Sequence, residues 1–399
     1  MSELTRFELN DLPFRANEVL QEITSNLVGW GRENNYLFKS NSYDNSHSLT
    51  VSAMSMLALH EVGHPIGDHT HDAILSHKQK DPITRGAFPA QVGKYCHTYG
   101  TAWILFACLH IRPSGVTSFY DTVDWLIAQR TDSNKGWGHT RDSHPRAFFT
   151  AYVLNSLLEY LECLSALDAA PQGLPKKIVK AVEDGIDFLM EDRRATDVML
   201  WSFDRKDQSV CIASTAIALH VLAKYFKGEF GCYHAHAENF REMVGSTFEA
   251  LGTSLGPNSL TTGETVIKAG KQNFRVNLWP LLKEDAPSGY ANAYFTPLIG
   301  VTFLEMCKML YPNGIAALRS EILVFVEWII NNVSRDENGK SEGVLGPGNR
   351  VYVWSTAKSI IVLSRWLNSL KDYVFTSDFV SGPVTPNPCA QLEPNSTNT

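Results

Sequence analysis

The sequence predicts an all-α protein built from two layers of helices, and three observations lead to this prediction. A short dipeptide that begins with Ser or Thr is followed by an apolar helical run six times along the chain. Amphipathic helical segments lie between these copies, and no convincing set of β-strands is present. Runs that are apolar nearly all round fit buried inner helices, whereas segments with a single apolar stripe fit half-exposed outer helices.

The six copies predict one inner helix each, and their small residues would let neighbouring helices approach closely. They start at Ser52-Ala53, Thr101-Ala102, Thr150-Ala151, Thr215-Ala216, Thr296-Pro297 and Thr356-Ala357. The spacings of 49, 49, 65, 81 and 60 residues leave room for a helical hairpin in each repeat. They are too irregular for a linear solenoid of identical units.

The outer layer is predicted from segments that carry acids and amides opposite an apolar stripe. The clearest are residues 119–129, 178–191 and 322–333, while the β-prone residues 350–353 stand isolated. We expect one domain over residues 1–375. Residues 376–399 contain four prolines among polar residues, which predicts a disordered tail.

Composition excludes several classes of partner. Of the 399 residues, 44% are hydrophobic and 19% charged, as in globular proteins. The net charge of −7 argues against nucleic acid or an anionic membrane as the main partner. No apolar run approaches the roughly 18 residues of a membrane span. A polar start without a secretory signal and seven scattered cysteines predict a cytoplasmic protein with reduced thiols.

A tryptophan precedes three of the inner helices in a turn-rich loop. Trp137, Trp201 and Trp279 lie 13, 14 and 17 residues ahead of the Thr that opens the helix. This order of outer helix, Gly/Trp loop and inner helix resembles the repeat of the terpene cyclase and protein prenyltransferase β-subunit superfamily, over about residues 15–370. The resemblance implies an α/α toroid of six inner and six outer helices around a central cavity.

His60, Glu61 and His64 match the H-E-x-x-H motif of zinc peptidases. Two neighbours conflict with it. Pro65 disfavours helical geometry at His64, and Gly63 stands where the first repeat requires a helix-ending glycine. A chance match within a repeat is therefore favoured over a peptidase.

Cys96 and His97 form a second candidate metal site. The pair resembles parts of the zinc sites of toroid enzymes, but the Trp-Cys dipeptide of lanthipeptide cyclases is absent and Lys94 replaces the Asp of prenyltransferases. A structural zinc site needs four ligands, and the pair supplies two. Zinc or magnesium is thus a possible cofactor without a complete ligand set.

Acidic loops before the third, fourth and fifth inner helices are the candidate catalytic site. Asp142, His144, Asp204 and Asp207 are the predicted catalytic residues. The predicted ligand contacts are Trp137, His139, Trp201, Trp279, Glu284 and Asp285. Carboxylates beside an apolar cavity have raised pKa values and can protonate an alkene, while tryptophan faces steady a cation. The D-x-D-D motif of such cyclases is absent. Loop salt bridges and packing by the tryptophans are the competing explanations.

Two functions remain open on these observations. The first is a cavity for an apolar, isoprenoid-like small molecule in a terpene cyclase- or prenyltransferase-like enzyme. The second is a non-catalytic toroid that binds a protein partner as part of a larger assembly.

Overall fold

A computed structural model gives the arrangement of the chain. It describes residues 6–34, 36–40, 46–65, 68–130, 135–167, 174–193, 199–203, 210–227, 237–255, 264–269, 272–277, 289–310, 320–345 and 350–379. Helices dominate these residues, and the strands among them are short.

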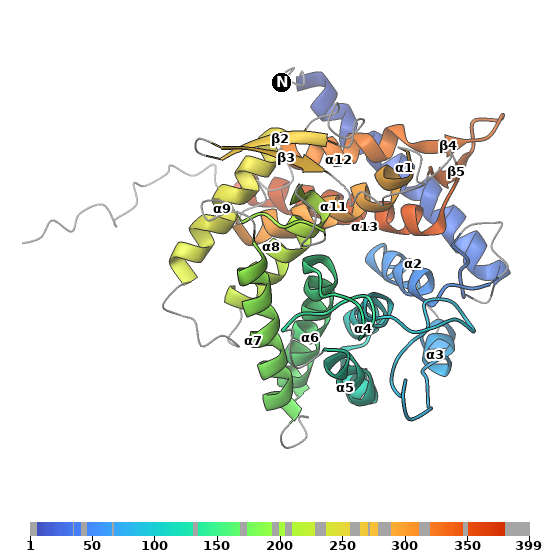
Figure 1. The fold of residues 1–399 in the computed structure, drawn as a ribbon. Coiled ribbons are helices and arrows are strands. Elements are labelled where there is room, and N and C mark those ends of the chain that lie inside the picture. Colours follow the sequence, from blue (N-terminus) through green and yellow to red (C-terminus); the bar gives the residue numbers. More distant parts are fainter. Residues whose placement is uncertain are drawn as a thin grey trace, which may run out of the picture.

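Six helices form a closed inner ring. They are α2 (Leu49–Glu61), α4 (Thr98–Ile111), α6 (Ala147–Leu167), α8 (Ile212–Lys227), α11 (Gly289–Leu310) and α13 (Val353–Phe379). Each packs on the next in chain order, and α13 packs on α2, so that the ring closes (Figure 1). Each contains one copy of the Ser/Thr dipeptide.

The outer layer alternates with the inner one along the chain. It consists of α1 (Arg6–Glu33), α3 (Asp68–Ser76), the 3-10 helix η1 (Pro113–Phe119) with α5 (Tyr120–Ala128), α7 (Leu174–Asp192), α9 (Ala237–Ser254) and α12 (Ser320–Asn331). α1 packs on α13, and each of the others packs on the inner helix beside it in the chain. The predicted all-α toroid of six inner and six outer helices is confirmed.

The Ser or Thr of the repeat holds the loop that precedes its helix. A backbone N–H from that loop donates to the hydroxyl oxygen over 2.8–3.1 Å in the pairs Phe38–Ser52, Phe88–Thr101, Trp137–Thr150, Trp201–Thr215 and Val344–Thr356. Both partners are buried, and a buried N–H without an acceptor costs about 1–3 kcal/mol. In these five copies the hydroxyl therefore fixes the loop to the inner ring, whereas the buried hydroxyl of Thr296 has no hydrogen-bond partner among the described residues.

Two small sheets lie outside the toroid layers. β2 (Glu264–Ala269) and β3 (Gln272–Asn277) form an antiparallel hairpin, to which β1 (Val210–Cys211) adds a parallel strand. β4 (Val333–Arg335) pairs with β5 (Ser341–Val344). The sequence did not predict the hairpin, because two six-residue strands within one loop produce little periodicity. Residues 350–353 form no strand: Val351 makes a single bridge to Leu345, and α13 begins at Val353.

The last inner helix runs past the expected domain boundary. α13 ends at Phe379, four residues beyond the predicted limit at 375. The rest of the predicted tail lies outside the described residues. Across the described part of the chain, none of the helices combines the length and the apolar character needed to cross a membrane.

Candidate functional site

The inner helices surround a central cavity of about 490 Å³. Its walls repeat from helix to helix: the side chains two, five and nine residues after the aligned Ser/Thr line it on most of the six helices. Steps of three and four residues keep these positions on one face of an α-helix. The cavity is thus walled by three layers of side chains stacked along the axis.

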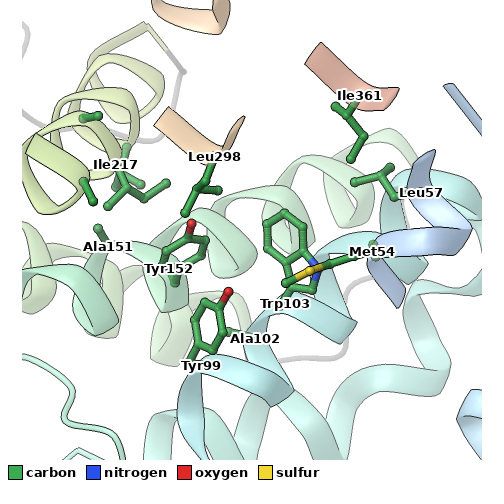
Figure 2. Close-up of a cluster of buried hydrophobic side chains, with 14 of the residues drawn as sticks. Met54, Leu57, Tyr99, Ala102, Trp103, Ala151, Tyr152, Ile217, Leu298 and Ile361 are labelled. Atoms are coloured by element: carbon green, nitrogen blue, oxygen red, sulfur yellow. The ribbon is translucent and has the colours of Figure 1, made fainter. Parts of the chain in front are cut away.

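The deep layer stands two residues after the aligned position. It consists of Met54, Trp103, Tyr152, Ile217, Leu298 and Lys358, and all six residues are buried. Figure 2 shows its apolar members gathered from several inner helices, with Tyr99 next to Tyr152. The rings of Tyr99 and Phe148 each lie 4.9 Å from that of Tyr152, so aromatic side chains pack beneath this layer on the N-terminal side.

The middle layer stands five residues after the aligned position. It consists of Leu57, Phe106, Asn155, His220, Val301 and Ile361, which all line the cavity. Burial lowers the pKa of His220 to about 4, so its imidazole is neutral at neutral pH. Apolar side chains make up most of these two layers, and the cavity therefore favours an apolar occupant.

The third layer, which we name the ionic ring, stands nine residues after the aligned position. It consists of Glu61, His110, Glu159, Lys224, Glu305 and Arg365, so acids and bases alternate around the six helices. The ring side chains are 13–35% exposed, whereas the deep layer is buried. The cavity therefore opens towards solvent at the C-terminal ends of the inner helices.

Ion pairs join most neighbours in the ionic ring. Arg365 donates from Nε to Oε1 of Glu61 over 2.9 Å and from Nη1 to Oε1 of Glu305 over 3.0 Å. Lys224 Nζ donates to Oε2 of Glu159 over 2.6 Å. The nitrogens of His110 lie 3.6 Å from Glu61 and 3.9 Å from Glu159. Among the described residues, only the junction of α8 and α11 lacks such a pair.

These contacts keep two of the ring carboxylates, those of Glu61 and Glu305, ionised. Burial alone would raise the pKa of Glu61, but hydrogen bonds from His110 and Arg365 outweigh it and lower the pKa to about 2. For Glu305, burial is again outweighed, here by the charges of Arg365 and Lys308, and the pKa falls below its usual value. At neutral pH the carboxylates of Glu61 and Glu305 can therefore bind cations, but they cannot serve as acids.

The predicted catalytic residues lie at the opposite end of the toroid, where described. Asp142 and His144 are exposed in the loop before α6. That loop packs on the N-terminal end of α4, where Thr98 N–H donates to the His139 carbonyl over 3.0 Å. Asp204, Asp207, Trp279, Glu284 and Asp285 lie outside the described residues. The structure does not bring Asp142 or His144 to the cavity wall.

Trp137 and Trp201 are fully buried between the two layers. Their indole N–H groups donate to the carbonyls of Leu126 and Leu189, both over 2.7 Å, near the ends of α5 and α7. These bonds explain Trp137 and Trp201 as residues that anchor the packing between the layers. Contact of either tryptophan with a ligand stays a prediction. His139 is half-buried and stacks on His97, with ring centroids 4.5 Å apart.

Cys96 and His97 lie just before α4. Nδ1 of His97 accepts the N–H of Gly100 over 2.9 Å and so caps the helix. Burial, followed by the influence of His139, lowers the pKa of His97 to about 4, and burial raises that of Cys96 to about 11. Within the described ranges, no three His, Cys, Asp or Glu side chains gather as a metal site would require.

The H-E-x-x-H segment ends a helix, as its neighbours predict. Gly63 has φ +68°, and the N–H groups of Gly63 and His64 donate to the carbonyls of His60 and Leu59 over 2.9 Å. This pattern is a Schellman termination, which takes His64 off the helix. Glu61 belongs to the ionic ring and is bound to Arg365. The segment thus lacks the helical spacing that two zinc-binding imidazoles need.

Comparison with known proteins places the fold. No family model matches the chain, and no curated protein matches its sequence. An α-1,6-mannanase of family GH76 from Salegentibacter has a TM-score of 0.58 at 10% identity, covering 89% of this chain and 99% of its own. A glycosyl hydrolase of family 88 from Bacteroides vulgatus has a TM-score of 0.56 at 11% identity, covering 89% of this chain and 99% of its own. A type II terpene cyclase from Scytonema has a TM-score of 0.52 at 11% identity, covering 91% of this chain and 100% of its own.

The chain is an α/α toroid. At 10–11% identity the likeness shows the fold alone. The TM-scores to the glycoside hydrolases and to the terpene cyclase are similar. The likeness therefore supports the wider toroid group without singling out the terpene cyclase and prenyltransferase superfamily that the repeat resembles.

Sequence reasoning missed the ionic ring, although the signal is present in the repeat. When the six copies are aligned on their Ser or Thr, the position nine residues later is ionisable in every copy. The predicted site residues lie in the loops before the inner helices, on the N-terminal side of the toroid. The cavity opens on the C-terminal side.

Proposed function

We propose that the central cavity binds a small amphipathic molecule with an apolar, isoprenoid-like body. The single observation that carries this proposal is the order of the layers, with two mostly apolar layers beneath a ring of paired charges. A volume of about 490 Å³ is in the range of small-molecule sites. Each Å² of apolar ligand surface buried there contributes about 25 cal/mol.

The aromatic members of the wall favour an unsaturated ligand. Trp103 and Tyr152 in the deep layer and Phe106 in the middle layer line the cavity. The faces of aromatic rings attract cations, including those that develop from double bonds. A polar end of the ligand would lie at the ionic ring, where acids and bases are both within reach.

The enzymatic form of this proposal is a terpene cyclase- or prenyltransferase-like reaction. The ring acids Glu61 and Glu305 have lowered pKa values and do not supply the proton that starts alkene cyclisation. That proton would have to come from Asp204 or Asp207, which lie outside the described residues, because Asp142 and His144 do not reach the cavity wall. The ring acids would instead stabilise positive charge on the ligand.

A non-catalytic toroid is the second candidate. The observation that favours it is the pairing within the ionic ring, because acids and bases that satisfy one another can act as a structural closure. In that case the cavity would hold no ligand, and the chain would serve as a binding component of a protein assembly.

Titration calorimetry distinguishes these proposals. We expect farnesol to bind the wild-type protein and α-1,6-mannotriose not to bind. Leu298→Trp should abolish farnesol binding by filling the deep layer, while Val266→Trp, on an exposed strand position, should leave it unchanged. Binding of the sugar alone, or of neither probe, would overturn the proposed ligand class.

A further inference from the structure

Lys358 is a basic residue in an otherwise uncharged deep layer. It lies on α13, lines the cavity and has an exposed fraction of 0%. Its Nζ is 5.9 Å from the ring centre of Trp354, one turn earlier on the same helix. Lysine is almost never fully buried in proteins, and here one lies at the floor of an apolar cavity.

The surroundings of Lys358 favour the neutral amine. Burial lowers its pKa to about 7, because a charged ammonium loses its hydration there. About half of such a group is neutral at pH 7, against roughly one in three thousand for an ordinary lysine. A neutral amine in a desolvated pocket is a nucleophile that attacks carbonyl carbons.

Other polar atoms of the wall indicate that the occupant carries an oxygen. Trp103 Nε1, Asn155 Oδ1 and His220 Nδ1 are buried and have no hydrogen-bond partner among the described residues. All three residues line the same cavity as Lys358. Buried polar atoms normally find a partner, which here must come from the contents of the cavity. The indole N–H of Trp103 is a donor suited to a carbonyl oxygen, whereas Asn155 Oδ1 is an acceptor that needs a donor such as a hydroxyl group or water.

We propose that Lys358 captures the carbonyl group of an apolar aldehyde or ketone as an imine. This inference rests on the proposed function, since the same cavity must accept the apolar body of the molecule. It narrows the ligand class to carbonyl compounds whose carbonyl group lies in the deep layer, at the end of the molecule opposite the ionic ring, and it assigns a covalent step to one side chain.

The step balances without an oxidant or reductant. The Nζ lone pair attacks the carbonyl carbon, a C–N bond forms, and the oxygen takes up a proton. The C–O bond then breaks, the oxygen leaves as water, and nitrogen loses its remaining proton to leave the imine. His220 is neutral and faces the cavity, so it can pass protons between nitrogen, oxygen and solvent.

Reductive trapping on the full chain tests the proposal. The protein is incubated with citral, an isoprenoid aldehyde, and sodium cyanoborohydride at pH 7, and the modified lysines are identified by peptide mass spectrometry. We expect Lys358 to be alkylated at least about tenfold faster than Lys94, which is exposed. Lys358→Met should remove that fast adduct and retain slow labelling at Lys94, and Leu298→Trp should do the same by filling the cavity.

The outcomes separate this inference from the proposed function. Labelling of Lys358 no faster than Lys94, in a protein that still binds farnesol, would overturn imine capture and leave the ligand class standing. Failure of both labelling and farnesol binding would overturn both. Circular dichroism of Lys358→Met confirms that the variant folds. If it does not, protection of wild-type Lys358 by farnesol is measured instead, and unprotected labelling would contradict the proposal.

Discussion

Arg365 and Glu61 lie 304 residues apart in the chain and are joined by a hydrogen bond of 2.9 Å from Nε to Oε1. The contact connects the last inner helix to the first. Ser364 adds a bond from its hydroxyl to the carbonyl of Glu61 over 3.0 Å. The chain is linear, so these interactions and the packing of α13 on α2 complete the circle that encloses the cavity.

Arg365→Met should destabilise the toroid strongly. It leaves the carboxylates of Glu61 and Glu305 partly buried without their main cation. Breaking a pair of this kind costs about 3 kcal/mol. Urea unfolding followed by circular dichroism measures the effect. Arg335→Met is the matched control, because its partner Glu22 is 39% exposed and such surface pairs contribute less than about 1 kcal/mol. Equal losses in the two variants would contradict a structural role for the ring.

The ionic ring should make stability fall in acid. The pKa of Glu61 is about 2 in the folded protein against an ordinary 4.5. A lowered carboxyl pKa stabilises the fold fully above the unfolded value, and this stabilisation is lost as the pH falls through the folded value. Between about pH 5 and pH 2 the wild type should lose roughly 3 kcal/mol more than Glu61→Gln. Parallel pH profiles of unfolding free energy would contradict the assigned pKa.

Thr215→Val should destabilise the fold through the loop that it holds. The buried N–H of Trp201 would lose its acceptor at 3.0 Å, at a cost of about 1–3 kcal/mol. Thr117→Val, at an exposed position of η1, should change the unfolding free energy by less than about 0.5 kcal/mol. Thermal unfolding of both variants checks the prediction. The prediction is wrong if the two variants lose equal amounts of unfolding free energy.

Asp207→Asn should lower turnover of an isoprenoid substrate about a hundredfold, as expected for loss of a general acid, whereas Asp142→Asn should not, because Asp142 is exposed away from the cavity wall. Their unfolding free energies should change by well under about 2 kcal/mol. Asp72→Asn, at an exposed position of α3, is the control. Wild-type turnover in Asp207→Asn would contradict a general acid in this loop, and the absence of any turnover in the wild type would favour the non-catalytic toroid.

The fold was predictable because the repeat carries it in several independent copies. The Ser or Thr of each inner helix and the apolar stripes of the outer helices are local signals, and the closed ring follows from the number of copies. The β2–β3 hairpin was not predictable in the same way, because it occurs once and pairs short strands within a single loop.

The candidate site depends on a relationship that local patterns do not express. Glu61, His110 and Arg365 look like ordinary surface charges of three separate helices in the sequence. Only their common position relative to the aligned Ser or Thr places them in one layer, and only closure of the ring makes them neighbours. The burial of Lys358 was not predictable for the same reason. A lysine in a helix is expected to be exposed unless the helix is known to line a cavity.

Native mass spectrometry with added farnesol tests the central claim most directly. The account predicts a one-to-one complex with the wild-type chain, no complex with Leu298→Trp, and an undiminished complex with Val266→Trp. A wild-type spectrum that shows only the free protein would contradict a ligand-binding cavity, as would a complex that persists in Leu298→Trp.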